Sequence, residues 1–181
     1  MSRPKEPFPA KLMVGLIYKE KDEACSGWKA MEKKWGAIEI LSKVRPFTYT
    51  RYYEQEMGQP LFRRWAFFED LVPQDRLADI KKEALELEEP WQHQGKRCLN
   101  IDPGLITAER LVLSTGKNYS HRIYLGQGIF GDLTLIFHQG SFQPLPWTYP
   151  DYKDEEAIGL FNRIREKYLR EISEGQFQSV E

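Results

Sequence analysis

Asp102 and His121 are the two side chains best suited to acid–base or metal chemistry. Asp102 ends the predicted strand 97–102, and sheets with helices often place ligands at strand ends. A histidine near an aspartate can act as a general base or bind a metal. Each also has a structural alternative: Asp102 could accept backbone N–H groups in a turn, and His121 could be a partly buried, satisfied histidine. The sequence identifies neither a metal nor a cofactor.

Arg122 follows His121 and shares the opposite face of its predicted strand with Tyr124. An arginine there can pair with a carboxylate or phosphate of a ligand. Residues 47–58, here called the tyrosine segment, form a long polar and aromatic connection, and such connections are often lids. We therefore expect a small polar or phosphorylated metabolite whose anion is held by Arg51 and Arg122. The side chains expected to close over it are Tyr49, Arg51, Tyr52, Tyr53 and Glu54.

The same aromatic residues support a second hypothesis. The tyrosine segment and the loop at residues 147–152 (WTYPDY) could form the partner surface of a non-catalytic interaction module. An enzyme would bring Asp102, His121 and Arg122 into one concave pocket, whereas a module would expose a flat aromatic patch. The geometry of these residues therefore separates the two hypotheses.

Residues 126–131 read GxGxxG, a pattern known from nucleotide-binding loops. Such a loop needs a helix directly after it, because the helix N-terminus holds the pyrophosphate. Here residues 132–138 alternate as a strand instead. Residues 114–117 contain Gly-Lys but lack the first glycine of a P-loop. The sequence therefore predicts turn glycines at both places.

The elements that must position these side chains alternate between strand and helix. Apolar runs and period-two alternation predict strands, and apolar residues at helical spacing predict helices. In chain order we expect strand 11–18, helix 21–35, strand 37–42, strand 61–71, helix 73–90 and strand 97–102. This order is the ferredoxin-like unit. The prediction is an α+β fold: a mixed, mainly antiparallel sheet whose ferredoxin-like βαββαβ first half is extended by a β-meander and a C-terminal helix at 154–173.

The meander occupies residues 118–145, after a strand at 111–115, and its apolar pattern predicts a register. Ile123 should lie opposite Leu133 and His121 opposite Leu135, which places Tyr124 beside Asp132 and Arg122 beside Thr134. The intervening loop 126–130 should contain a glycine with positive φ and a bulge. After the turn at Gln139-Gly140, Phe142 should lie opposite Phe137.

Composition indicates one domain over residues 1–181, with a flexible arm at 1–9 and a frayed tail at 175–181. The formal net charge of −1 gives no strong nucleic-acid signal. No apolar run is long enough for a membrane span. Cys25 and Cys98 lack metal-ligand spacing, which favours reduced cysteines in a cytoplasmic protein. The oligomeric state is not predicted.

Five segments together resemble one family: KLMVGLIYK, PFTYTRYYEQEMG, CLNIDPGLIT, NYSHRIYLGQGIF and WTYPDY. The chain is similar, from about Lys11 to Tyr168, to an uncharacterised bacterial family known as domain of unknown function 4416. The resemblance implies no established activity. Similar proteins have sometimes been labelled GTP-binding, but this sequence has neither a P-loop nor an NKxD guanine motif, so GTP binding is disfavoured.

Overall fold

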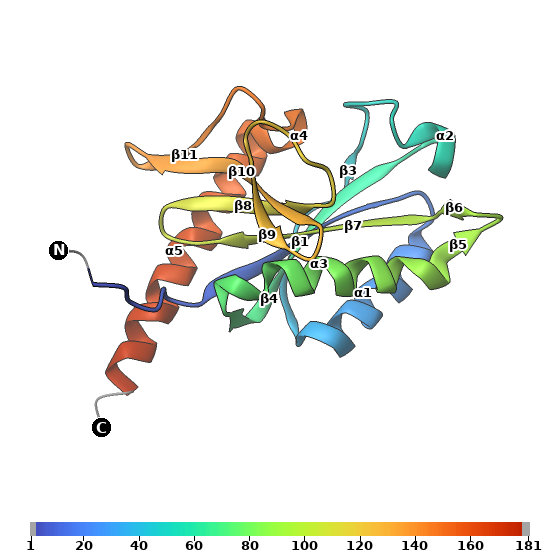
Figure 1. Cartoon of the computed structure of the whole chain (residues 1–181). Helices are drawn as coiled ribbons and strands as arrows, with labels where there is room; N and C mark the ends of the chain where they lie inside the picture. Colours follow the sequence, from blue (N-terminus) through green and yellow to red (C-terminus); the bar gives the residue numbers. More distant parts are fainter. Residues whose placement is uncertain (1–2, 179–181) are drawn as a thin grey trace.

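The computed structural model describes residues 3–178 of the chain (Figure 1). The strands of its main sheet are β1 (Ala10–Tyr18), β2 (Ile38–Leu41), β3 (Arg45–Pro46), β4 (Phe62–Val72), β7 (Leu99–Ile106), β8 (Arg110–Thr115), β9 (Arg122–Gly126), β10 (Ile129–His138) and β11 (Ser141–Pro144). A separate ribbon is formed by β5 (Gln92–His93) and β6 (Lys96–Arg97). The helices are α1 (Lys21–Trp35), α2 (Glu54–Met57), α3 (Leu77–Glu88), α4 (Pro150–Lys153) and α5 (Glu155–Gln178), with 3-10 turns η1 (Gln74–Arg76) and η2 (Glu89–Trp91).

Strand β1 lies inside the sheet because its side chains are mostly apolar on both faces, and every residue of the strand is buried. It pairs with β4 on one side and with β7 on the other. The strand order is β11-β10-β8-β7-β1-β4-β2, and every pairing within residues 3–178 is antiparallel. The predicted α+β class with a mainly antiparallel sheet is therefore confirmed. The ferredoxin-like assignment of the first half stays a prediction.

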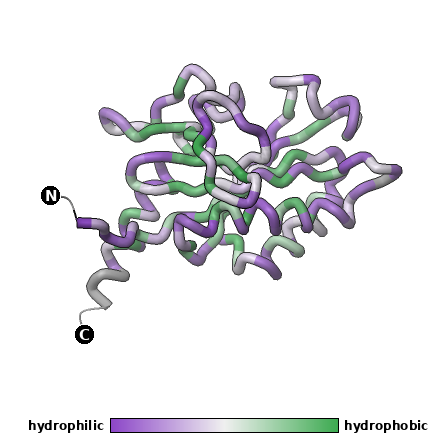
Figure 2. Tube along the Cα trace, in the orientation of Figure 1, coloured by the Kyte–Doolittle hydropathy of each residue, from purple (hydrophilic) through white to green (hydrophobic). Residues whose placement is uncertain are grey.

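Helices cover both faces of the sheet (Figure 1). On one face, α1 and α3 bury side chains such as Trp28 and Ile80 against the strands. On the other face, α5 buries Phe161 and Ile164. Figure 2 shows hydrophobic segments in the strands between these layers and hydrophilic segments along the loops. Burial on both faces supplies the apolar contact that stabilises the sheet.

The predicted register of β9 is wrong by two residues. Ile123 pairs with Gly131 and Arg122 pairs with Asp132, whereas the prediction placed Ile123 opposite Leu133. The reason is the turn: Gln127 and Gly128 both have positive φ and close a two-residue hairpin, so the connection is shorter than the predicted loop. The predicted glycine with positive φ and the bulge are present.

Strands β9 and β11 both pair with β10, which pairs with β8 as well. Strand β9 pairs with residues 129–132 of β10 and β11 with residues 135–138, because β8 occupies the other edge along residues 130–136. Phe142 lies opposite Phe137, as predicted. The predicted apolar face of β9 is not buried: Ile123 is 71% exposed. The alternation of apolar and polar residues in β9 therefore occurs in an exposed strand and does not mark a face that packs on the core.

The start of β1 is held against the C-terminal helix. The Tyr168 hydroxyl donates to the Pro9 carbonyl at 2.9 Å, which ties the start of β1 to α5. Helix α5 extends to Gln178, four residues into the predicted frayed tail. Residues 1–2 of the predicted arm and 179–181 of the tail lie outside the described residues. Among the helices of residues 3–178, none combines the length and apolar character that crossing a membrane requires.

Candidate functional site

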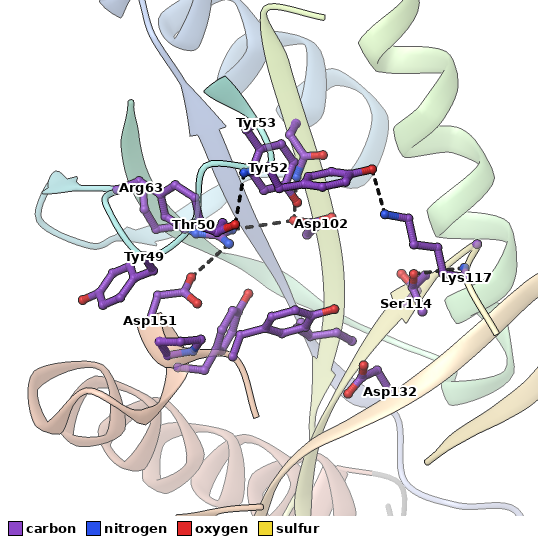
Figure 3. Close-up of a pocket in the computed structure, with 18 of the residues that line it drawn as sticks. Tyr49, Thr50, Tyr52, Tyr53, Arg63, Asp102, Ser114, Lys117, Asp132 and Asp151 are labelled. Carbon is purple, nitrogen blue, oxygen red and sulfur yellow. Dashed lines mark hydrogen bonds and ion pairs between the residues drawn. The ribbon is translucent and has the colours of Figure 1, made fainter. Parts of the chain in front are cut away.

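A cavity of about 590 Å³ lies between the first half of β7, the end of β8, the tyrosine segment and α4 (Figure 3). Its charged wall residues are Arg63, Lys81, Arg97, Asp102, Lys117, Asp132 and Asp151. Its aromatic wall residues are Phe47, Tyr49, Tyr52, Tyr53, Tyr149 and Tyr152. The cavity therefore offers both signs of charge and several hydroxyl groups to a ligand.

Arg63 on β4 is the most deeply buried cation of the wall, with a side chain that is 6% exposed. Its Nη2 lies 3.0 Å from Asp151 Oδ2, and its Nη1 lies 3.8 Å from Asp102 Oδ2 (Figure 3). Burial by itself lowers the pKa of Arg63, but these two carboxylates and two nearby tyrosines outweigh it and raise the pKa above its ordinary value. Within the described residues, Nε and Nη1 have no hydrogen-bond partner. Arg63 is therefore a charged, buried group with two nitrogens that lack a hydrogen bond, one of which still lies in a long ion pair with Asp102.

Gly15 on β1 makes room for this guanidinium. A Cβ at Gly15 would lie 2.4 Å from Arg63 Nη1 and 2.9 Å from the Tyr152 hydroxyl, so a larger residue would push both groups away. The guanidinium also lies over the rings of Phe47 and Tyr152, with distances of 5.3 and 5.6 Å to their centroids. These contacts fix the direction of the arginine.

Asp102 belongs to the cavity, as predicted, but its local structure differs from the prediction. Strand β7 continues through Pro103 to Ile106, so Asp102 does not end a strand and the alternative of a capping aspartate in a turn is wrong. The Pro103 carbonyl instead accepts from the Ser114 hydroxyl on β8 at 2.9 Å. Pro103 fits an inner strand because β7 pairs with β1 alone at this position and with β8 only from Gly104 onward, so no ladder hydrogen bond is lost on the second side.

Asp102 accepts hydrogen bonds from two neighbours. Lys81 Nζ on α3 donates to Oδ1 at 3.3 Å, and Asn100 Nδ2 donates to Oδ2 at 2.6 Å. Asn100 and Asp102 share one face of β7, as their spacing predicts. Because the Asp102 side chain is still 24% exposed, a ligand in the cavity can reach this carboxylate.

Arg97 holds the tyrosine segment in place. Its Nε and Nη2 donate to the two oxygens of Glu56 on α2 at 2.7 and 2.9 Å. Its Nη1 donates to Glu88 Oε2 at 3.2 Å and to Asn100 Oδ1 at 3.0 Å. The hydrogen bonds from Arg97 lower the pKa of Glu56, whereas burial raises the pKa of Glu88. The two parallel hydrogen bonds from Arg97 to Glu56 position α2 against β6, and the bond to Asn100 connects both to β7.

The tyrosine segment contributes its rings to the cavity and leaves its charged side chains outside. Tyr53 is half-buried, and burial followed by the charge of Asp102 raises its pKa, so its hydroxyl stays protonated. Lys117 Nζ donates to the Tyr52 hydroxyl at 2.8 Å and joins the segment to the end of β8 (Figure 3). Arg51 is exposed, and neither it nor Glu54 lies in the cavity wall.

His121 and Arg122 lie behind the cavity wall and bind one carboxylate. His121 Nε2 lies 3.3 Å from Asp132 Oδ2, and Arg122 Nε donates to the same oxygen at 2.9 Å. Arg122 Nη2 also donates to the Tyr149 hydroxyl at 2.8 Å. The histidine therefore pairs with Asp132 and not with Asp102, because the two-residue shift of β9 brings Arg122 opposite Asp132.

Two further aromatic contacts complete this side. The His121 ring stacks on Trp147, with centroids 4.7 Å apart. Tyr124 packs on Phe130 and is 60% exposed, away from the cavity wall. Of the predicted site residues, the structure thus brings Asp102, Tyr52 and Tyr53 into the wall, as it does Tyr49. It places His121 and Arg122 outside the wall, where both contact the wall residue Asp132.

Sequence reasoning missed most of the charged wall. The missed residues are Arg63, Lys81, Arg97, Lys117, Asp132 and Asp151. One signal was available: Arg63 interrupts the apolar run LFRRWAFF, and a charge inside a buried strand needs a partner or a ligand. Within the described residues, no group of three or more His, Cys, Asp or Glu side chains could hold a metal ion.

Comparison with known proteins gives a family and no activity. A search of the curated proteins and a search of the solved structures found no match. The predicted bacterial origin stays a prediction. A family model described as Domain of unknown function (DUF4416) matches residues 8–168, so the chain belongs to this family, as its five segments predict.

Proposed function

We propose that this protein binds a small polar metabolite in the cavity beneath the tyrosine segment, and that it does so in the cytoplasm. One observation carries the proposal: the cavity of about 590 Å³ is lined by Arg63, a buried arginine with two guanidinium nitrogens that have no hydrogen-bond partner among the described residues. Leaving buried donors unpaired costs about 1–3 kcal/mol each, and a ligand oxygen would offset that cost. The free thiol of Cys25 supports a reducing compartment.

The polar groups have separate roles in this proposal. Arg63 donates to the ligand, and Asp102 accepts from it and is the acid–base candidate if a reaction follows. His121 and Arg122 act through Asp132, whose carboxylate they orient toward the cavity. Tyr52 and Tyr53 cover the ligand.

The rival hypothesis is an interaction module that presents aromatic loops to a partner. Both loops turn aromatic rings toward the same cavity: Tyr49, Tyr52 and Tyr53 from one side and Tyr149 from the other. Trp147 is engaged by stacking on His121 and by donating from Nε1 to the Leu133 carbonyl at 2.7 Å. This arrangement favours ligand binding over a flat partner surface.

A thermal-shift screen of sugars, sugar phosphates, organic acids and nucleotides tests the proposal. A ligand at 100 times its dissociation constant should stabilise the protein by about 2.7 kcal/mol. The variant Asp102→Asn keeps the shape of the side chain but removes its charge, and it should abolish the shift. Asp75→Asn changes an exposed carboxylate on η1 and should leave the shift intact. The proposal fails if no compound stabilises the protein, or if Asp102→Asn retains the full shift.

A further inference from the structure

The cavity wall is built from ion pairs. Asp102 lies 3.3 Å from Lys81 Nζ, and Asp151 lies 3.0 Å from Arg63 Nη2. Asp132 is paired in the same way with Arg122, at 2.9 Å. The interior of the cavity therefore offers both hydrogen-bond donors and acceptors to a ligand.

The combination of donors and acceptors in the wall favours a ligand that can both donate and accept hydrogen bonds. An ionised carboxylate only accepts hydrogen bonds, and a guanidinium or ammonium group only donates them, whereas a hydroxyl group does both. A hydroxyl placed between Arg63 and Asp102 could accept from the arginine and donate to the aspartate. A phosphate dianion in the same place would lie beside the carboxylates of Asp102 and Asp151. These groups are also negatively charged acceptors, so they would repel it. The interior thus matches a polyol better than a multiply charged anion.

The rings at the mouth fit the same ligand. Tyr49, Tyr52 and Tyr149 line the cavity and are 41%, 59% and 43% exposed, so their surfaces are available for contact. An aromatic ring offers a flat apolar surface and a polar hydroxyl tip, which suits the C–H face and the hydroxyl rim of a sugar ring.

Lys117 differs from the other cations of the wall. Within residues 3–178 no carboxylate lies within ion-pair distance of its ammonium group, which instead contacts the hydroxyl and the ring of Tyr52. Arg63, Lys81 and Arg97 each have a carboxylate partner. The uncompensated positive charge of the cavity therefore lies at its mouth (Figure 3).

We propose that the cavity recognises a sugar-like polyol that carries a single anionic group. The hydroxyls lie inside, against the Arg63–Asp151 and Lys81–Asp102 pairs, and the phosphate or carboxylate group lies at the mouth on Lys117. This inference rests on the proposed function and names the substrate class of the same site.

Calorimetric titration of the full chain tests it with a pentose, a hexose, their monophosphates, the matching sugar acids, inorganic phosphate and a nucleoside triphosphate. A sugar monophosphate or sugar acid should bind at least about tenfold more tightly than the free sugar or inorganic phosphate. Lys117→Gln should weaken binding of the anionic sugar by about five- to tenfold and leave the free sugar unchanged. Lys29→Gln, an exposed change on α1, should alter neither. Added salt should weaken only the anionic sugar.

Three results would overturn the inference while leaving the proposed function standing. These are tighter binding of the nucleoside triphosphate, equal binding of inorganic phosphate alone, and an unchanged affinity for the anionic sugar in Lys117→Gln. A screen hit from another chemical class with no sugar binding would do the same. If no compound bound in the titrations or in the thermal-shift screen, both the further inference and the proposed function would be wrong.

Discussion

Lys11 on β1 and Arg63 on β4 are both buried cations of the central sheet, but their surroundings differ. Lys11 Nζ donates to the carbonyls of Phe68 and Glu69 at 3.1 and 3.0 Å. It also lies 3.0 Å from Glu39 and 2.8 Å from Glu171, and its side chain is fully buried. Arg63 has one close carboxylate partner, and two of its nitrogens have no hydrogen bond within residues 3–178.

This difference indicates that Lys11 has a structural role and that Arg63 is placed to bind a ligand. The ammonium group of Lys11 has four protein oxygens within 3.1 Å, and this cluster joins β1, β2, β4 and α5. Arg63, in contrast, lines a cavity, and Gly15 leaves room for its guanidinium. The cation at one end of β1 is therefore enclosed by protein partners, whereas the cation near the other end forms part of a cavity wall.

Lys11→Met should give the largest loss of stability. Among the described residues it leaves Glu39 and Glu171 with only Lys167 as a partner, so the free energy of unfolding should fall by about 3 kcal/mol. Urea unfolding measures this loss, and ligand affinity should not change. Lys167→Met removes the more exposed cation of the same cluster and should cost no more than about 1 kcal/mol. Equal losses in the two variants would show that burial of Lys11 is not the cause.

Arg63→Lys should reverse that pattern, with a small loss of stability and a large loss of binding. A lysine can still pair with Asp151 but cannot place two further donors in a fixed fork. The affinity for a sugar monophosphate should fall at least about tenfold, or about 1.4 kcal/mol, by calorimetry. Arg64→Lys is the matched control, since Arg64 donates to the Ser42 carbonyl at 2.6 Å and lies outside the cavity wall. A comparable loss in the control would contradict the role of Arg63.

The Lys11 cluster should also depend on pH. Burial alone would raise the pKa of Glu171, but hydrogen bonds from Lys11 and Lys167 outweigh it and lower the pKa. The stabilisation is then complete above the ordinary value of 4.5 and is lost as the pH falls through the lower folded-state value. Glu171→Gln should cost about 1 kcal/mol at neutral pH and reduce the acid dependence of urea unfolding. Glu174→Gln, an exposed change, should preserve that dependence; if it removes it equally, the assignment to Glu171 is wrong.

Tyr52→Phe should have the smallest effect. It removes the hydroxyl that accepts from Lys117, but both side chains are exposed, so stability should change by less than about 0.5 kcal/mol. A thermal melt measures it. A loss above about 1 kcal/mol would mean that this contact stabilises the fold, as the Lys11 cluster does.

The fold was more predictable from the sequence than the site. The apolar run of β1 and the helical spacing in α1 and α3 are long local patterns, and they predicted these elements correctly. The register of β9 depended on a two-residue turn with positive φ at Gln127, a non-glycine residue that gives little local signal. Short exposed strands lack the one-sided burial that fixes a register.

The site was predicted in part for a related reason. Asp102, Tyr52 and Tyr53 reach the cavity from segments whose composition was unusual in itself. Arg63 and Asp151 meet across the tertiary structure, and no local pattern predicts that pairing. Pairing of His121 with Asp132 required the correct register of β9.

An NMR titration that follows the Nε–H group of Arg63 tests the central claim most directly, because this group is buried and has no hydrogen-bond partner in the described residues. Adding a sugar monophosphate to the ¹⁵N-labelled protein should shift this resonance and slow its exchange with water, since a ligand oxygen accepts its proton. The account is contradicted if the Arg63 resonance stays unchanged at saturation while the Trp147 indole and the outer surface of β9 shift.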